Sequence, residues 1–427
     1  MHWRRPVAIS LATGLWLAGG VAHGQQAMQL RPSIEETEQA VAAPVKRKST
    51  VDPYAPVGFH TGGILFYPSL TAGTVVTSNV RQASSDAQTE IGLRLKPSLR
   101  FESDWVRHSW IGEARYDGVR YLEQGDLTSH EADLFSKFRL DIRRDTRAEF
   151  EAGYNLDQTG LADSEVPATA VGYRTEHRLS TAAALIHDFG PLEARVKAGV
   201  GWKIYDDVKL SGGGTEDNAD RDYITPSLSL RATYMDPPVF KPYLQAAYEP
   251  RYYLRKRDRN GLQRSSQGLA ASAGVIVDRG PFWSGDLAAT YLRRDYEDRA
   301  LESDNAFGLD GSLIWTPDDL TRVVLAFGTS LEDAVSTTSS SNRNWRGRID
   351  LTHGWRENID VLAGAGIEIE ETGAGDDVTY DANLGLEWKL GPSLAWTAGY
   401  DVTWLDAAAS GRSYTEHRIS AGLSLSR

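Results

Sequence analysis

Residues 378–390 alternate strictly between two kinds of side chain. One set is apolar: Val378, Tyr380, Ala382, Leu384, Leu386, Trp388 and Leu390. The other set is polar or small: Thr379, Asp381, Asn383, Gly385, Glu387 and Lys389. A period of two is that of a β-strand with one face in an apolar phase and the other in water. Strands of soluble proteins usually span about five or six residues. A longer alternation that recurs along the chain indicates a membrane-spanning β-barrel.

From residue 59 onward the pattern predicts eighteen strands. Their expected spans are 62–77, 87–102, 105–121, 127–142, 146–158, 172–188, 191–206, 221–235, 240–256, 265–278, 281–296, 303–316, 319–332, 342–355, 358–371, 377–390, 393–406 and 413–426. Bacterial single-chain barrels have even strand counts. We therefore predict an all-β fold, a transmembrane antiparallel β-barrel of about 18 strands with both termini periplasmic. Pro68, Pro97 and Pro226 lie within these spans, and we expect bulges there because proline cannot donate to the ladder.

Short and long connections alternate between these strands, which is a second, independent sign of a barrel. The short ones lie near 103–104, 143–145, 189–190, 236–238, 279–280, 317–318, 356–357 and 391–392. The longer ones are 78–86, 122–126, 159–171, 207–220, 257–264, 297–302, 333–341, 372–376 and 407–412. Short turns of such barrels face the periplasm, and long loops face outward. A long loop such as 207–220 is a candidate for folding into the channel.

Aromatic residues gather near the short turns. The nine that lie within a few residues of one are Trp105, Phe189, Tyr234, Phe240, Phe282, Trp283, Trp315, Trp355 and Trp388. Trp and Tyr prefer the headgroup layer of a membrane, where the ring is half buried and its polar tip stays wet. Rings that pack the core of a soluble sandwich are the alternative, but their crowding at one predicted rim favours an aromatic girdle.

Charged residues occupy the face opposite to the apolar one. We predict that the pore is lined by Arg94, Lys96, Arg100, Glu131, Asp133, Lys137, Arg139, Glu149, Glu151, Arg174, Glu176, Arg178, Glu193, Arg195, Lys197, Glu249, Arg251, Arg346, Arg348, Asp350, Asp381 and Glu387. In a soluble sandwich the same residues would form a solvated face. Opposite charges on neighbouring strands attract across about 5 Å. The signs are mixed, which suits a large, polar, neutral or modestly charged solute better than an ion filter.

The N-terminal residues predict export. Arg4 and Arg5 precede an apolar stretch, and a small-residue site ends at Gly24, so residues 1–24 read as a signal peptide. Residues 25–58 are rich in charge and proline, which predicts a flexible periplasmic tail before a barrel of residues 59–427. The mean hydropathy of −0.40 and the absence of a long apolar run exclude a helical membrane protein. The formal charge is −12, so we expect no nucleic-acid partner.

No catalytic or metal-binding motif stands out. The nine histidines are scattered, none lies in a nucleophile motif, and the chain has no cysteine. We therefore expect no enzyme activity, no catalytic residues, no metal and no cofactor. Two acidic pairs, Asp318–Asp319 and Asp376–Asp377, could hold calcium, but solvated acidic turns are the commoner explanation.

The first two predicted strands carry a family resemblance. The first contains Pro68, Ser69 and Leu70 and ends near Asn79, and the second contains Pro97, Ser98 and Leu99 and leads into Ser103, Asp104 and Trp105. This resembles the family called putative β-barrel porin 2. The resemblance implies an outer-membrane barrel that is often associated with exopolysaccharide secretion.

The leading hypothesis is an export port for an exopolysaccharide in the bacterial outer membrane. Its expected partners are outer-membrane lipid and the barrel-assembly machinery, and the resemblance adds the polysaccharide and a periplasmic polysaccharide-export component. The alternative is a general or substrate-selective diffusion porin for small solutes. A lipid-modifying barrel enzyme and a purely adhesive barrel are third and fourth readings.

Overall fold

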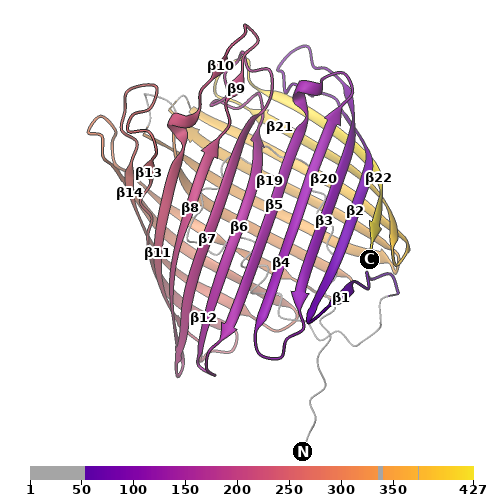
Figure 1. Ribbon diagram of the computed structural model, residues 1–427, viewed down its shortest axis with the longest axis vertical. Helices are drawn as coiled ribbons and strands as arrows, with labels where there is room; N and C mark the ends of the chain where they lie inside the picture. Colours follow the sequence, from indigo (N-terminus) through magenta and orange to yellow (C-terminus); the bar gives the residue numbers. More distant parts are fainter. Residues whose placement is uncertain (1–52, 335–339, 374) are drawn as a thin grey trace, which may run out of the picture.

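A computed structural model describes residues 53–334, 340–373 and 375–427, and within them the wall is a closed antiparallel barrel (Figure 1). Its strands in order are β2 (Ile64–Thr77), β3 (Glu90–Ser103), β4 (Ser109–Tyr121), β5 (Ser129–Asp141), β6 (Thr146–Thr159), β7 (Arg174–Phe189), β8 (Leu192–Tyr205), β11 (Tyr223–Tyr234), β12 (Phe240–Tyr248) with β13 (Tyr252–Tyr253), β14 (Ser266–Asp278), β15 (Trp283–Tyr296), β16 (Asp304–Trp315), β17 (Thr321–Asp333), β18 (Ser341–Arg356), β19 (Ile359–Thr372), β20 (Gly375–Gly391), β21 (Leu394–Asp406) and β22 (Tyr414–Ser426). The last strand pairs with the first, with Thr77 opposite Arg418. The predicted barrel of 18 strands is therefore confirmed.

Proline shapes the wall differently from the prediction. The segments β12 and β13 together fill one place in the barrel, and both pair with β11 in one register. That register sets Pro226 against Pro250 at the break, where neither residue has an N–H to donate. The expected bulges were wrong, because the register runs on past Pro68, Pro97 and Pro226. The register shifts lie elsewhere, beside two short turns, at Gly354/Arg356 and at Lys389/Gly391.

The connections define two rims, which we call the short-turn rim and the long-loop rim. The long loops hold the short elements η1 (Gly125–Leu127), β9 (Val208–Lys209), β10 (Thr215–Glu216) and η2 (Ala219–Arg221). At the short-turn rim, β1 (Phe59–Thr61) adds to β2. One predicted long loop, 372–376, was wrong, because β19 and β20 stay paired up to Thr372 and Gly375. The predicted signal peptide 1–24 and residues 25–52 of the predicted tail lie outside the described residues.

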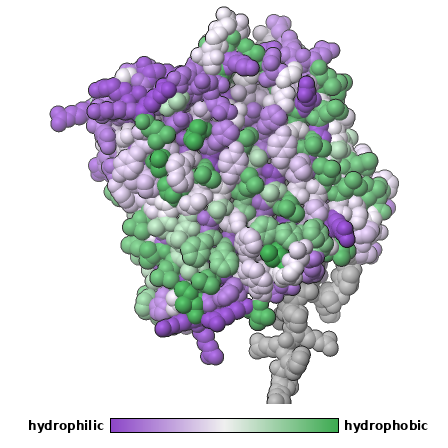
Figure 2. Space-filling model, viewed as in Figure 1, coloured by the Kyte–Doolittle hydropathy of each residue, from purple (hydrophilic) through white to green (hydrophobic). Residues whose placement is uncertain are grey.

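The outer face of the wall is apolar. Leu93, Leu244 and Leu384 have 58%, 67% and 56% of their surface exposed, although they are large aliphatic residues. Figure 2 shows such residues gathered over the central and lower wall, with hydrophilic residues above them at the long loops. Exposed aliphatic residues over so wide an area fit contact with lipid. Among the described residues, no helix is long and apolar enough to cross a membrane.

Aromatic side chains mark the short-turn rim, as the sequence predicts. Eight of the nine predicted residues are exposed, and the ninth, Trp283, stacks on Trp315 with ring centroids 5.5 Å apart. A second set, which was not predicted, lies nearer the long-loop rim and includes Tyr380 stacked on Trp404 at 5.3 Å. Strand β20 thus carries an outward aromatic residue at 380 and another at 388, with Leu384 midway between them.

Candidate functional site: the interior and mouth of the barrel

Opposite charges meet on the inner face of the wall. Arg94 and Lys96 of β3 both contact Asp117 of β4, at 2.5 and 3.0 Å. Their neighbours in sequence, Leu93 and Leu95, are exposed on the outer face. Two positive charges and one negative charge thus share a patch of the interior, as the alternation of β3 requires.

A longer network joins residues of β5, β6 and β8 and so spans four strands. Lys137 of β5 lies 3.1 Å from Glu149 and 3.2 Å from Glu151 of β6. The same carboxylates bind Arg195 at 3.1 Å and Lys197 at 2.5 Å, although these two cations lie on β8. Strand β7 separates β6 from β8, and it sets small residues, Ala184 and Ala182, opposite the two glutamates. The long cationic side chains therefore reach over β7.

Most other residues of the predicted set also contact partners. Arg346 lies 2.8 Å from Glu368, Arg348 lies 2.8 Å from Asp350 and 2.6 Å from Asp381, Glu193 lies 2.5 Å from Arg147, and Arg251 lies 2.9 Å from Asp333. Arg178 contacts Glu176, Arg139 lies 2.8 Å from Asp141, Asp133 lies 3.9 Å from Arg115, and Arg174 lies 3.5 Å from Glu165. Arg100 packs over the ring of Tyr67 at 4.4 Å. Glu131, Glu249 and Glu387 are partly or fully buried. The interior is thus polar, with its charges paired locally.

The interior is wet at mid-height and packed near the long-loop rim. On β4 and β5, the side chains of Glu113, Arg115 and Asp133 are 40%, 37% and 46% exposed. Near the long-loop rim, Arg174 and Glu176 are only 1% and 2% exposed. Arg174 and Glu176 therefore lie in a tightly packed part of the long-loop rim.

Part of this packing comes from the loop of residues 160–173, which we call the constriction loop. Ala162 packs against Leu405 and Tyr414, which belong to the inner faces of β21 and β22. Its carbonyl oxygen accepts two hydrogen bonds from Arg412, at 2.8 and 2.5 Å. Strands β2 to β5 separate β22 from β6, where the loop begins. The loop therefore extends across part of the mouth.

The constriction loop is held along its length by apolar and polar contacts. Leu161 and Tyr173 pack against a buried cluster that includes Val80, Tyr121 and Leu127. Burial raises the pKa of Asp163; Arg174 acts in the opposite direction and Glu165 adds to the increase. The constriction loop is thus anchored on an apolar cluster and carries an ionisable residue, Asp163, whose pKa is raised.

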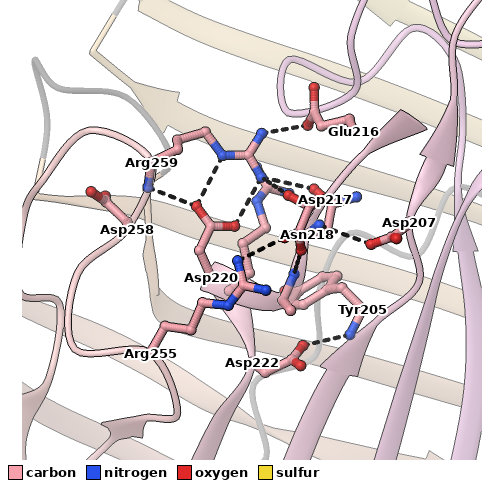
Figure 3. Close-up of polar contacts among 12 residues, drawn as sticks. Tyr205, Asp207, Glu216, Asp217, Asn218, Asp220, Asp222, Arg255, Asp258 and Arg259 are labelled. Atoms are coloured by element: carbon pink, nitrogen blue, oxygen red, sulfur yellow. Dashed lines mark hydrogen bonds and ion pairs between the residues drawn. The ribbon is translucent and has the colours of Figure 1, made fainter. Parts of the chain in front are cut away.

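A second loop, 206–222, folds against the first. Ala170 and Leu210 form an antiparallel bridge between the two loops. Arg259 holds the second loop in place (Figure 3). Its guanidinium donates hydrogen bonds to both carboxylate oxygens of Asp220, at 3.0 and 2.9 Å. It also donates to the carboxylate of Glu216 at 2.5 Å. Burial raises the pKa of Asp220, but the hydrogen bonds from Arg259 outweigh it and hold the pKa below its usual value. We call this contact set the Arg259 clamp.

A family model described as putative beta-barrel porin 2 matches residues 52–427. The chain belongs to this family. It is thus a porin-type β-barrel of the bacterial outer membrane, and the family is one of channels rather than enzymes. No curated protein matches the sequence.

The chain also matches solved structures, two of which come from Pseudomonas aeruginosa. The outer membrane protein opdK from Pseudomonas aeruginosa is 13% identical, with a TM-score of 0.41, and the match covers 85% of this chain and 99% of that one. The siderophore receptor PirA from the same organism is 10% identical, with a TM-score of 0.37, and the match covers 85% and 80%. At these values the similarity carries no functional argument.

The mouth of this porin-family barrel contains residues that the sequence pattern did not single out. They include Asp163, Ala162, Arg221, Arg259 and Arg412, and all lie in connections rather than strands. Alternation could not identify them, because loops have no period of two. The loop proposed as a plug, 207–220, does pack at the mouth, where it lies against the constriction loop. The constriction loop was predicted as the long loop 159–171, but its contacts across the mouth were not. Among the described residues, no three His, Asp or Glu groups are placed to hold a metal ion.

The Arg259 clamp predicts how the loop 206–222 responds to pH. A carboxylate with a lowered pKa in the folded state stabilises that state above its ordinary pKa, about 3.9, and the contribution is lost as pH falls through the lowered value. A nitroxide label on Thr215→Cys, unique because the chain has no cysteine, should stay immobile from pH 7 to about 4 and become mobile below that pH. Arg259→Gln should make the label mobile already at pH 7.

Arg255→Gln is the matched control, because the ion pair of Arg255 with Asp217 is half exposed and should contribute little to holding the loop. Equal mobility in all three proteins would contradict the clamp.

Proposed function

We propose that this chain is the outer-membrane export port for an exopolysaccharide. The supporting observation is the interior face, where paired opposite charges surround a water-exposed middle section. A sugar polymer needs many hydrogen-bonding partners and no strong field of one sign, which would hold a charged solute or repel it. The association of the family with exopolysaccharide secretion adds to this. The proposal places the short turns and both termini on the periplasmic side of the membrane. It also assigns residues 1–24 as the signal peptide that directs secretion of this chain.

Deleting the gene tests the proposal. Polysaccharide should disappear from the cell surface and either collect in the periplasm or cease to be made. Reintroducing the wild-type gene should restore the surface polymer. Normal surface polymer in the deletion strain would exclude the export role.

A diffusion porin for small solutes is the second candidate. The constriction loop favours it, because a segment folded against the inner faces of β21 and β22 limits the size of what can pass. Liposomes that contain the purified barrel separate the two: a diffusion porin should admit monosaccharides freely and show a steep cut-off with oligosaccharide length.

A further inference from the structure

Arg221 is a buried cation with unused hydrogen-bond donors. It ends η2 at the inner side of the loop 206–222, and 9% of its side chain is exposed. Its Nε, Nη1 and Nη2 atoms are all buried without a hydrogen-bond partner. Of the arginines in the described ranges, it is the one whose three side-chain nitrogens share this condition. Leaving a buried charged donor without an acceptor is costly, so an acceptor is expected here.

The arginines around it are satisfied by carboxylates. Arg251 contacts Asp333 at 2.9 Å and Arg264 contacts Asp258 at 2.6 Å. Arg221 lies 3.6 Å from Glu165, which is too far for a hydrogen bond. Glu165 also lies 3.5 Å from Arg174. One carboxylate therefore faces two buried guanidinium groups.

Positive charge also converges on one aromatic ring beside Arg221. The ring of Tyr205 has the guanidinium carbon of Arg174 at 5.3 Å, the ammonium of Lys203 at 5.2 Å and the guanidinium carbon of Arg221 at 5.7 Å from its centre. Burial lowers the pKa of Arg221; Glu165 opposes this and Arg174 adds to it. Lys203 and Arg174 have carboxylate partners, Glu176 at 3.2 Å and Glu165 at 3.5 Å, so Arg221 is the cation here whose side chain still needs an acceptor.

A cavity of about 30 Å³ lies beside Arg221, and its lining includes Tyr205 and Tyr223. It also brings together the guanidinium groups of Arg251, Arg259 and Arg264 and the carboxylates of Glu165, Asp220, Asp258, Glu332 and Asp333. It has room for a group of a few atoms but not for a sugar ring. A carboxylate fits such a space, and its two oxygens match the paired donors of a guanidinium. The partly exposed ring of Tyr223 offers a flat surface for the rest of a saccharide.

We propose that Arg221 forms a carboxylate-binding subsite in the mouth of the barrel, and that the transported saccharide is an acidic one, built with uronate units. This inference rests on the proposed function, since it names the class of polymer that the port carries. The subsite takes one carboxylate at a time, while the ring that bears it stays in the passage.

Ion-current block in planar bilayers tests the subsite. Trigalacturonate and the neutral maltotriose are added separately on the long-loop side of wild type, Arg221→Gln, Arg221→Lys and the control Arg255→Gln. In wild type and Arg255→Gln, trigalacturonate should block at a concentration at least about tenfold lower than maltotriose, the effect of one charge-assisted bidentate contact. Arg221→Gln should remove that difference, and Arg221→Lys should keep part of it.

The outcomes separate the two proposals. Equal block by both sugars in wild type, or an undiminished difference in Arg221→Gln, would overturn the subsite and leave the saccharide port intact. No block by either sugar would overturn the saccharide port and the subsite with it. Heat-dependent migration of each variant on SDS gels shows whether it has folded, and Arg221→Lys provides the test if Arg221→Gln does not fold.

Discussion

Replacing Leu384 with arginine is expected to destabilise the barrel by about 2–4 kcal/mol, the cost of an arginine facing lipid near the midplane of a membrane. Leu384 is 56% exposed on the outer face of β20. Tyr380 and Trp388, outward aromatic residues of the same strand, lie four residues before and after it. Aromatic residues mark the two membrane interfaces, so the midpoint between them is the deepest position. Urea unfolding in lipid vesicles measures the loss.

The matched control is Thr379→Arg on the same strand. Thr379 belongs to the inner face and stands opposite Glu368 of β19, so a new arginine there gains an acidic neighbour in a polar interior. We expect its free energy of unfolding to change by less than about 1 kcal/mol. Similar losses in both variants would mean that the inner and outer faces are assigned wrongly.

The wall could be predicted from sequence because every second residue of a membrane-spanning strand faces lipid and must be apolar. Tyr380, Leu384 and Trp388 all face outward because a register slip of one residue would place them in the polar interior. The same logic placed Arg94 and Lys96 on one face of their strand, whereas their partner Asp117 on the next strand was not predicted. Even the proline at 226 fits the wall, since it meets another proline across the ladder.

The mouth could not be predicted in this way. The contact between Ala162 and Arg412 joins residues 250 positions apart, and a backbone carbonyl carries no signature in the sequence. Likewise, Arg221 and Arg259 lie near one cavity. Nothing in their local sequence shows that the Arg259 side chain binds Asp220 and Glu216 while the side-chain nitrogens of Arg221 have no hydrogen-bond partner. These differences arise only when loops from separate strand pairs meet over the same opening.

Removing the constriction loop is expected to raise the single-channel conductance several-fold. A variant in which residues 162–170 are replaced by two glycines loses the packing of Ala162 on Leu405 and Tyr414 and the bridge to Leu210. The wall should remain intact, because β6 and β7 pair with each other along their whole length without the loop. Conductance in planar bilayers and the size limit for sugars in liposome swelling measure the result. An unchanged conductance would show that the loop does not limit the passage.

Arg412→Ala isolates the contact that holds the loop across the mouth. It removes both hydrogen bonds to the Ala162 carbonyl and the 3.1 Å pair with Asp377, which should cost about 1–3 kcal/mol locally. The loop should then fluctuate between closed and open positions, so the current should flicker with a mean between those of wild type and the deletion. Arg293→Ala is the control, because it breaks an arginine–aspartate pair of 2.9 Å that is exposed and remote from the loop. If the current of Arg412→Ala matches that of Arg293→Ala, the apolar contacts of the loop alone keep it in place.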